Sequence, residues 1–149
     1  MKPRVLILCT GNSARSQMAE GLLRAVAGEQ LEVESAGIAP SSVNPFAIRV
    51  MAERGVDIAH HRSKHVNEFL GQSFDAVMTV CDRAAEQCPV FPGKAERFHW
   101  SFPDPAAVQG TDEERLEAFR QVRDALETTL VTWAGEQGYL LTQEQRVSQ

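Results

Sequence analysis

The sequence predicts an α/β fold in three layers, with a central four-stranded parallel sheet and helices on both of its faces. Two observations support this class. Four short apolar runs alternate along the chain with four stretches that favour a helix. The first run is apolar at every position after its first residue, as in strands that are covered on both faces. Such an alternation is typical of right-handed crossovers between parallel strands.

Length and charge limit the organisation of the chain. With 149 residues it is long enough for one core that buries about two thirds of the unfolded surface. We expect one domain over 1–149, with 137–149 as a frayed polar tail. The net charge of −5 argues against a broad nucleic-acid surface, and no apolar stretch reaches the length of a membrane span. Three cysteines are too few for a secreted disulfide scaffold. The sequence therefore predicts a cytoplasmic protein with neither nucleic-acid nor membrane partners, and we expect a monomer.

The first half of the chain contains two strands and two helices. A strand is expected over 4–9, directly before a polar loop that contains a glycine. The next helix ends near Gly28, and the strand that follows it, over 31–36, alternates apolar and acidic residues. The second helix begins with the Asn44-Pro45 pair, an N-cap followed by proline, and ends at Gly55. The apolar residues at helical spacing in the first helix are Met18, Ala19, Leu22, Leu23 and Val26.

The second half repeats this alternation. A buried strand is expected over 74–80, a short helical turn over 82–86 and a fourth buried strand over 96–100. The last helix begins at a capping-box pattern over 111–114 and ends near Gly135. Its apolar stripe consists of Leu116, Phe119, Val122, Leu126, Leu130 and Trp133.

The loop after the first strand has the composition of an oxyanion site. Backbone N–H groups between a buried strand and a helix N-terminus form a concave site for a tetrahedral oxyanion. Arg15 can add a planar fork, and the same positive field stabilises a thiolate at Cys9. A buried structural cysteine and a surface arginine are the simpler interpretation, but the position between strand and helix favours the site. The loop is Cys9, Thr10, Gly11, Asn12, Ser13, Ala14, Arg15 and Ser16.

The segment Cys9–Glu20, which reads CTGNSARSQMAE, closely resembles the active-site loop and first helix of the low-molecular-weight protein tyrosine phosphatase superfamily. Within it, the segment is most similar to the thioredoxin-coupled arsenate reductases. This resemblance implies a phosphatase-like fold, a loop that binds arsenate, phosphate or sulfate, and Cys9 as the nucleophile. The similarity continues through Ser35-Ala36-Gly37, Asn44-Pro45, Val80-Cys81, Cys88-Pro89, His99-Trp100 and Asp104-Pro105.

The other two cysteines distinguish a reductase from a phosphatase. Cys81 ends a predicted strand at the same sheet edge as Cys9. Cys88 follows seven residues later, about 10 Å along a helix axis, so a Cys81–Cys88 disulfide requires the helix to unwind. Pro89 favours unwinding, because the residue before a proline disfavours helical geometry. The spacing fits a thiol relay, and the resemblance implies the same shuttle pair. Two small core residues are the alternative, while a zinc site with His99 lacks a standard spacing.

The resemblance also implies partners and an acid. Asp104 would protonate the departing oxygen, although Asp-Pro is also a common turn. We expect no tightly bound cofactor and no metal, with reducing equivalents supplied by thioredoxin. A phosphatase that hydrolyses phosphotyrosine is the alternative enzyme, and an oxyanion-binding or redox-sensing module is the non-catalytic one.

Several residues are expected to support the loop. Asn12 and Ser16 order it, and Ser35 supports Asn12. Some arsenate reductases of this family bind potassium beside the loop with four side chains, and two of those positions align with Arg62 and Lys64. We therefore expect no potassium, with the Lys64 ammonium in its place. The histidines show no ligand pattern, and His60 and His61 are expected in a solvated loop.

Overall fold

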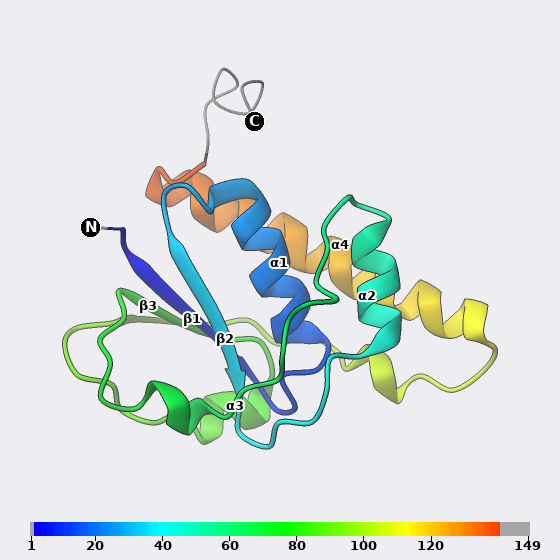
Figure 1. Cartoon of the computed structure of the whole chain (residues 1–149), viewed down its shortest axis with the longest axis horizontal. Coiled ribbons are helices and arrows are strands. Elements are labelled where there is room, and N and C mark those ends of the chain that lie inside the picture. The colour runs from blue at the N-terminus through cyan, green and yellow to red at the C-terminus, as the bar shows by residue number, and fades with distance from the viewer. Residues whose placement is uncertain (1, 141–149) are drawn as a thin grey trace.

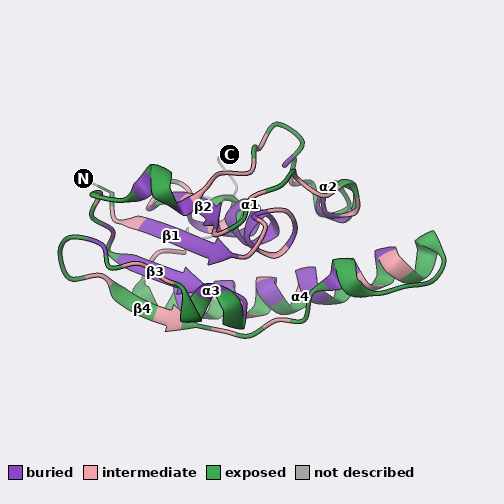
Figure 2. Ribbon diagram, turned by 90° about the horizontal axis from the view of Figure 1, so that it is seen from below, coloured by how far each residue is buried: buried purple, intermediate pink, exposed green. Residues whose placement is uncertain are grey.

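The computed structural model describes residues 2–140 and confirms the predicted α/β class. Four parallel strands form one sheet in the order β2-β1-β3-β4 (Figures 1 and 2). The register pairs Cys9 at the end of β1 with Gly37 at the end of β2. The strands are β1 (Arg4–Cys9), β2 (Glu32–Gly37), β3 (Ala76–Thr79) and β4 (Glu96–His99).

Four α-helices connect and follow these strands. Two of these helices, the second and the last, begin directly after the capping residue that the sequence predicts. Asn44 accepts a hydrogen bond from the Phe46 amide, and Thr111 forms a reciprocal capping box with Glu114. The helices are α1 (Arg15–Ala27), α2 (Pro45–Ala52), α3 (Asp82–Glu86) and α4 (Asp112–Gln137), with short 3₁₀ turns η1 (Val66–Phe69) and η2 (Pro105–Ala107).

Side chains of β4 show how the helices divide between the two faces of the sheet. Phe98 packs edge to face against Trp133 of α4, and α4 packs against α1 and α2. Arg97 and His99, which point to the other face, contact Cys88 and Asp82 at the two ends of α3. Helices α1, α2 and α4 therefore cover one face, and α3 covers part of the other.

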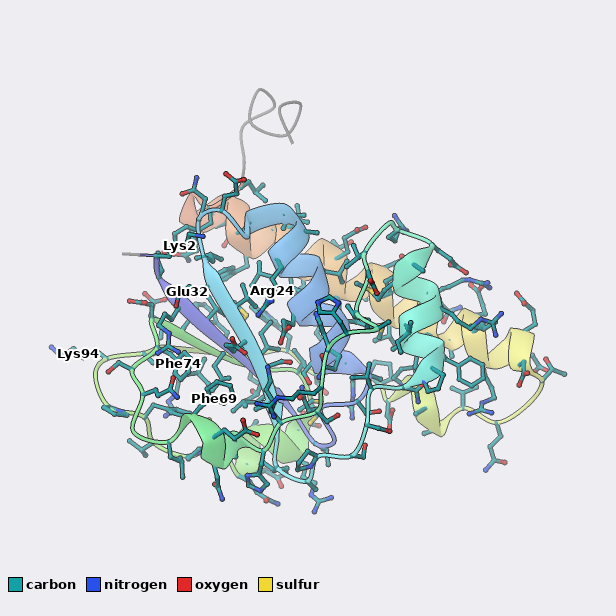
Figure 3. The ribbon with its side chains drawn as sticks, viewed as in Figure 1. Lys2, Arg24, Glu32, Phe69, Phe74 and Lys94 are labelled. Atoms are coloured by element: carbon teal, nitrogen blue, oxygen red, sulfur yellow. The ribbon has the colours of Figure 1, made fainter. Side chains whose placement is uncertain are left out.

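The core lies between these layers. In β1 the four residues Val5–Leu8 are almost inaccessible to solvent, as expected for a central strand. Phe69 and Phe74 pack edge to face, with ring centroids 5.9 Å apart (Figure 3). None of the helices within 2–140 combines the length and the apolar character that crossing a membrane requires.

Two expectations about individual elements were wrong. The fourth strand is not buried: β4 is an edge strand, and of its residues only Phe98 is half-buried (Figure 2). The last helix continues past Gly135 to Gln137, and Gly138 ends it with a φ of 78°. A glycine inside a helix does not end it, whereas the left-handed conformation after its last turn does. Gln137, where the predicted tail begins, is the last residue of α4, and residues 141–149 of that tail lie outside the described part.

An ion network joins α2 to α4. Arg123 is 5% exposed, and its Nη1 donates to the Val50 carbonyl at 2.8 Å and to Glu53 Oε1 at 2.9 Å. Arg120 Nη2 donates to Glu53 Oε2 at 3.0 Å. These cations lie at the C-terminal end of α2, where the helix dipole favours positive charge. The network therefore fixes the packing of α2 on α4.

Replacement of Glu53 by glutamine is expected to destabilise the protein in a pH-dependent manner. Hydrogen bonds from Arg120 and Arg123 lower the pKa of Glu53 from 4.5 to about 2. A carboxylate with a lowered folded-state pKa stabilises the fold above pH 4.5, and this stabilisation is lost as the pH falls towards 2. At this partly exposed position we expect Tm to fall by about 2–4 °C at pH 7. Thermal unfolding at pH 7 and pH 3 measures the difference in Tm between the wild type and Glu53→Gln, which should be smaller at pH 3.

The exposed Glu136 of α4 supplies the control, since Glu136→Gln should leave Tm unchanged at both pH values. A Glu53→Gln difference that is equal at pH 7 and pH 3 would contradict the role of the ion network.

Candidate active site

The backbone of the loop Cys9–Ser16 is turned so that its carbonyl groups point away from the loop centre. Four of these carbonyls accept hydrogen bonds from amides of the segment 38–44. Because the peptide N–H lies opposite the carbonyl, the N–H groups of the loop turn towards its concave side. The bonds run from Ile38 N to Cys9 O (3.3 Å), Ala39 N to Thr10 O (2.9 Å), Ser41 N to Gly11 O (3.1 Å) and Asn44 N to Ser13 O (2.9 Å).

The N-terminus of α1 adds further donors. Its N-cap is Ala14, a residue whose side chain has no atom that could accept a hydrogen bond. The first backbone N–H groups of a helix require partners from outside the helix, and the dipole makes this end positive. The loop and the first turn of α1 together therefore suit a tetrahedral oxyanion.

Hydrogen bonds give the Cys9 thiol a defined environment. The thiol is buried, and its Sγ lies 2.9 Å from Ser16 Oγ. Asn12 Nδ2, which can only donate, lies 2.7 Å from the same Ser16 oxygen. The Ser16 hydroxyl therefore has its own proton free for Cys9 Sγ. A thiolate, the form in which cysteine is a nucleophile, could accept this hydrogen bond.

Asn12 holds the shape of the loop. It is the non-glycine residue with a left-handed backbone in residues 2–140, at a φ of 46°, a region that asparagine tolerates better than most residues. Its carbonyl accepts a 2.6 Å bond from Ser63 Oγ, and its Oδ1 accepts bonds from Lys64 N and Gln17 Nε2, both at 2.9 Å. Nδ2 also donates to Ser35 Oγ at 2.9 Å. The expected Asn12–Ser35 contact is present, whereas no local pattern indicates a role for Ser63 or Gln17.

A buried carboxylate lies beneath this network. Glu20 is 3% exposed, and its Oε1 accepts a 2.7 Å hydrogen bond from Ser35 Oγ. Lys64 Nζ lies 3.6 Å from Glu20 and 2.7 Å from Glu34 Oε2. Arg62, in contrast, directs its guanidinium to Glu68 at the surface. Of Arg62 and Lys64, Lys64 alone therefore lies at Glu20.

His61 was wrongly expected in a solvated loop. Its side chain is 8% exposed, and its Nδ1 lies 2.9 Å from Gln17 Oε1 and 3.4 Å from Glu20 Oε2. Burial lowers the pKa of His61, against the raising effect of the Glu20 carboxylate. His60, 69% exposed, does lie at the surface. The neighbouring sequence could not separate the two residues, because the partners of His61 lie on α1.

Gly37 is required by the close approach of the loop. A Cβ at this position would lie 2.6 Å from Thr10 O and 2.8 Å from Asn12 N, both backbone atoms. From sequence, Gly37 was interpreted only as the end of a strand. The register that places it beside Cys9 explains its second role, as the surface on which the loop packs.

Arg15 connects the loop to the segment that carries Asp104. Arg15 Nη1 donates to the Phe102 carbonyl at 3.0 Å. The Asp104 carboxylate is exposed and accepts a 3.0 Å hydrogen bond from the Ala106 amide at the start of η2. The structure therefore brings the segment that contains Asp104 to the loop, while the role of Asp104 as general acid stays a prediction.

The three cysteines are free and differ in burial. Cys81 is buried at the N-cap of α3, and its Sγ lies 3.3 Å from Oγ1 of Thr10, the residue after Cys9. Cys88 is half-buried, beyond the C-terminal end of α3. The structure thus brings Cys81 to the loop and separates Cys88 from it by the five-residue helix.

Comparisons with known proteins agree with this geometry. The family described as low molecular weight phosphotyrosine protein phosphatase matches residues 4–146. An arsenate reductase of Halalkalibacterium halodurans is 46% identical over 133 residues, which cover 89% of this chain and 96% of the relative.

Two solved structures are also similar. An arsenate reductase in its oxidized state has a TM-score of 0.78 at 29% identity, covering 91% of this chain and 98% of that one. The tyrosine phosphatase Wzb from Escherichia coli K30, in complex with sulphate, has a TM-score of 0.76 at 26% identity, covering 91% and 99%.

Proposed function

Because the chain belongs to the low-molecular-weight phosphotyrosine protein phosphatase family, we propose that it uses the family's oxyanion loop to reduce arsenate to arsenite, with thioredoxin as the reductant. One observation carries the proposal: Cys81, a thiol that a phosphatase does not need, lies against Thr10 of the loop that contains Cys9. The name of the 46% identical relative, an arsenate reductase, supports the same activity.

The first step is an attack by the Cys9 thiolate on arsenate. Arsenate oxygens are bound by the N–H groups of the loop and of the first turn of α1. The Arg15 guanidinium gives up its hydrogen bond to the Phe102 carbonyl and binds two of these oxygens. A sulfur–arsenic bond forms, and one oxygen leaves as water after Asp104 has protonated it. The Ser16 hydroxyl stabilises the thiolate before the attack.

The second step reduces arsenic. Cys81 attacks Cys9 Sγ, so that a Cys9–Cys81 disulfide forms and the electron pair of the sulfur–arsenic bond passes to arsenic, which leaves as arsenite. In the third step Cys88 attacks Cys81 Sγ and releases the Cys9 thiolate. The Cys81–Cys88 disulfide then passes to thioredoxin. A helix of five residues is marginally stable by itself, so little opposes the unwinding that brings Cys88 to Cys81.

Hydrolysis of phosphotyrosine is the alternative activity. The sulphate-bound tyrosine phosphatase Wzb shares this fold, and the first step above is common to both reactions. The two activities differ in what resolves the Cys9 adduct, which is water in a phosphatase and Cys81 in a reductase. Removal of Cys81 therefore separates them.

Arsenate-dependent oxidation of NADPH, coupled through thioredoxin and thioredoxin reductase, tests the proposal. We expect Cys9→Ser to abolish turnover, since the nucleophile is lost. Cys81→Ser and Cys88→Ser should each reduce turnover to the background rate, because the relay cannot finish. Cys81→Ser should still hydrolyse p-nitrophenyl phosphate, which needs only Cys9. Turnover of arsenate at the wild-type rate by Cys81→Ser and Cys88→Ser would contradict the proposal.

Potassium is not expected to stimulate this enzyme. Lys64 already supplies a cation to Glu20 and Glu34, so the carboxylates beside the loop do not need a metal ion. We expect arsenate reduction at equal rates in potassium and sodium buffers of the same ionic strength. Lys64→Met should lower the rate, while Lys94→Met, at an exposed position, should not. Clear stimulation of the wild type by potassium would count against this role of Lys64.

A further inference from the structure

A small cavity lies on the α3 side of the sheet, outside the oxyanion loop. Its volume is about 170 Å³, and its walls include Val77 of β3 and Ala85 of α3. Two side chains with the chemistry of a reactive site, Cys88 and Arg97, also line it. Cys88 therefore has access to solvent, in contrast to the buried Cys9 and Cys81.

Arg97 makes direct contact with the Cys88 sulfur. Its Nη1 donates to Cys88 Sγ at 2.9 Å, and its Nη2 donates to the Pro89 carbonyl at 3.1 Å. A guanidinium carries its charge at every pH at which proteins are folded, and it can only donate. The sulfur is then the acceptor, and it accepts such a bond best as a thiolate. The contact therefore places a cationic donor on the sulfur that the relay would use as a nucleophile.

Arg97 and Cys88 lie on parts of the chain that differ in their freedom to move. Arg97 belongs to β4, where its register with Val77 of β3 fixes the backbone. Cys88 follows α3, which has to unwind if its sulfur is to reach Cys81. Arginine has a long flexible stem, so its charge can follow the sulfur over the first part of this movement. Arg97 on β4 thus supplies the charge, and Cys88, in the segment after α3, supplies the nucleophile.

We propose that Arg97 activates Cys88 for the last step of the relay, an inference that rests on the proposed function. In that step the Cys88 thiolate attacks Cys81 Sγ of the Cys9–Cys81 disulfide. The Cys81–Cys88 bond forms, the Cys9–Cys81 bond breaks, and its electron pair leaves on Cys9 as a thiolate. No other oxidant is needed, and the guanidinium neither gains nor loses a proton.

Alkylation of Cys88 tests the activation without arsenate. In a background of Cys9→Ser and Cys81→Ser, Cys88 is the remaining thiol, and its rate with iodoacetamide at pH 7 is measured. Arg97→Met should lower this rate about three- to tenfold, since the attacking sulfur loses the cationic donor that contacts it. Arg97→Lys should restore most of it, because the charge returns. Arg83→Met, which removes an exposed arginine from α3 itself, should have no effect.

A single turnover without thioredoxin tests the step in the relay. The three-cysteine protein is mixed with arsenate, quenched in acid at successive times, alkylated and mapped by mass spectrometry. We expect Arg97→Met to accumulate the Cys9–Cys81 disulfide and to form Cys81–Cys88 about three- to tenfold more slowly than the wild type. Thermal unfolding of each variant verifies that the fold is retained.

The outcomes separate the two proposals. Wild-type rates of alkylation, or of Cys81–Cys88 formation, in Arg97→Met overturn the inference about Arg97 alone. A wild-type protein that forms no disulfide with arsenate overturns the proposed function, and the relay role of Arg97 with it. Slower alkylation and slower disulfide formation, both recovered by Arg97→Lys, support the inference.

Discussion

Gly37→Ala is expected to lower kcat/KM at least about 100-fold for both arsenate and p-nitrophenyl phosphate, the loss that a misplacement of about 1 Å can cause. The new Cβ would lie 2.6 Å from Thr10 O and 2.8 Å from Asn12 N, so the loop itself has to move. Such overpacking also destabilises a fold by about 1–3 kcal/mol. Steady-state kinetics together with urea unfolding measure both effects.

Gly135→Ala is the matched control for this substitution. Gly135 lies inside α4, and a Cβ there would meet only the end of the flexible Leu140 side chain, at 3.3 Å. The same chemical change should therefore leave activity unchanged and stabilise the protein by up to about 1 kcal/mol, because alanine favours a helix over glycine. If Gly37→Ala kept wild-type kinetics, the close packing of the loop on β2 would not matter for catalysis.

Arg15→Lys is expected to lower kcat/KM for arsenate by about 10²–10³, the cost of losing one well-placed donor to the transition state. Lysine keeps the positive charge but lacks the planar fork that binds two oxygens at once. It also loses the 3.0 Å hydrogen bond to Phe102 O, which joins the loop to the segment with Asp104. We expect kcat to fall more than KM rises, because the fork fits the transition state best.

Arg49→Lys, at an exposed position of α2, is the control for the general effect of replacing arginine by lysine. It should retain wild-type kinetics with both substrates. A loss of less than about fivefold in Arg15→Lys would show that charge alone is enough and that the geometry of the guanidinium is not used.

Features determined by local sequence were predictable. The apolar run of β1, the Asn44 cap of α2 and the Thr111 capping box of α4 are each visible within a few residues. The position of the oxyanion loop follows from the strand before it and the helix after it. The loop residues, with Cys9 and Arg15, were therefore identified before any tertiary contact was known.

Features that depend on distant contacts were not predictable. Ser63, which is 51 residues from Asn12, and Gln17, which is 5 residues from it, both support the Asn12 side chain or carbonyl. The residues next to them in the sequence do not indicate this role. The exposure of β4 depends on its place at the edge of the sheet, which the order of elements along the chain does not determine. The side chain of His61 is largely covered because it contacts Gln17 and Glu20 of α1.

The alanine at the N-cap of α1 couples occupancy of the site to the stability of the fold. A serine, threonine or aspartate in place of Ala14 would add an oxygen that could accept hydrogen bonds at this helix end, and it would compete for the N–H groups that face the loop. A bound oxyanion supplies this missing cap, so ligand binding and folding are thermodynamically linked. A substitution of Ala14 that made the protein more stable would thus lower its affinity for the substrate.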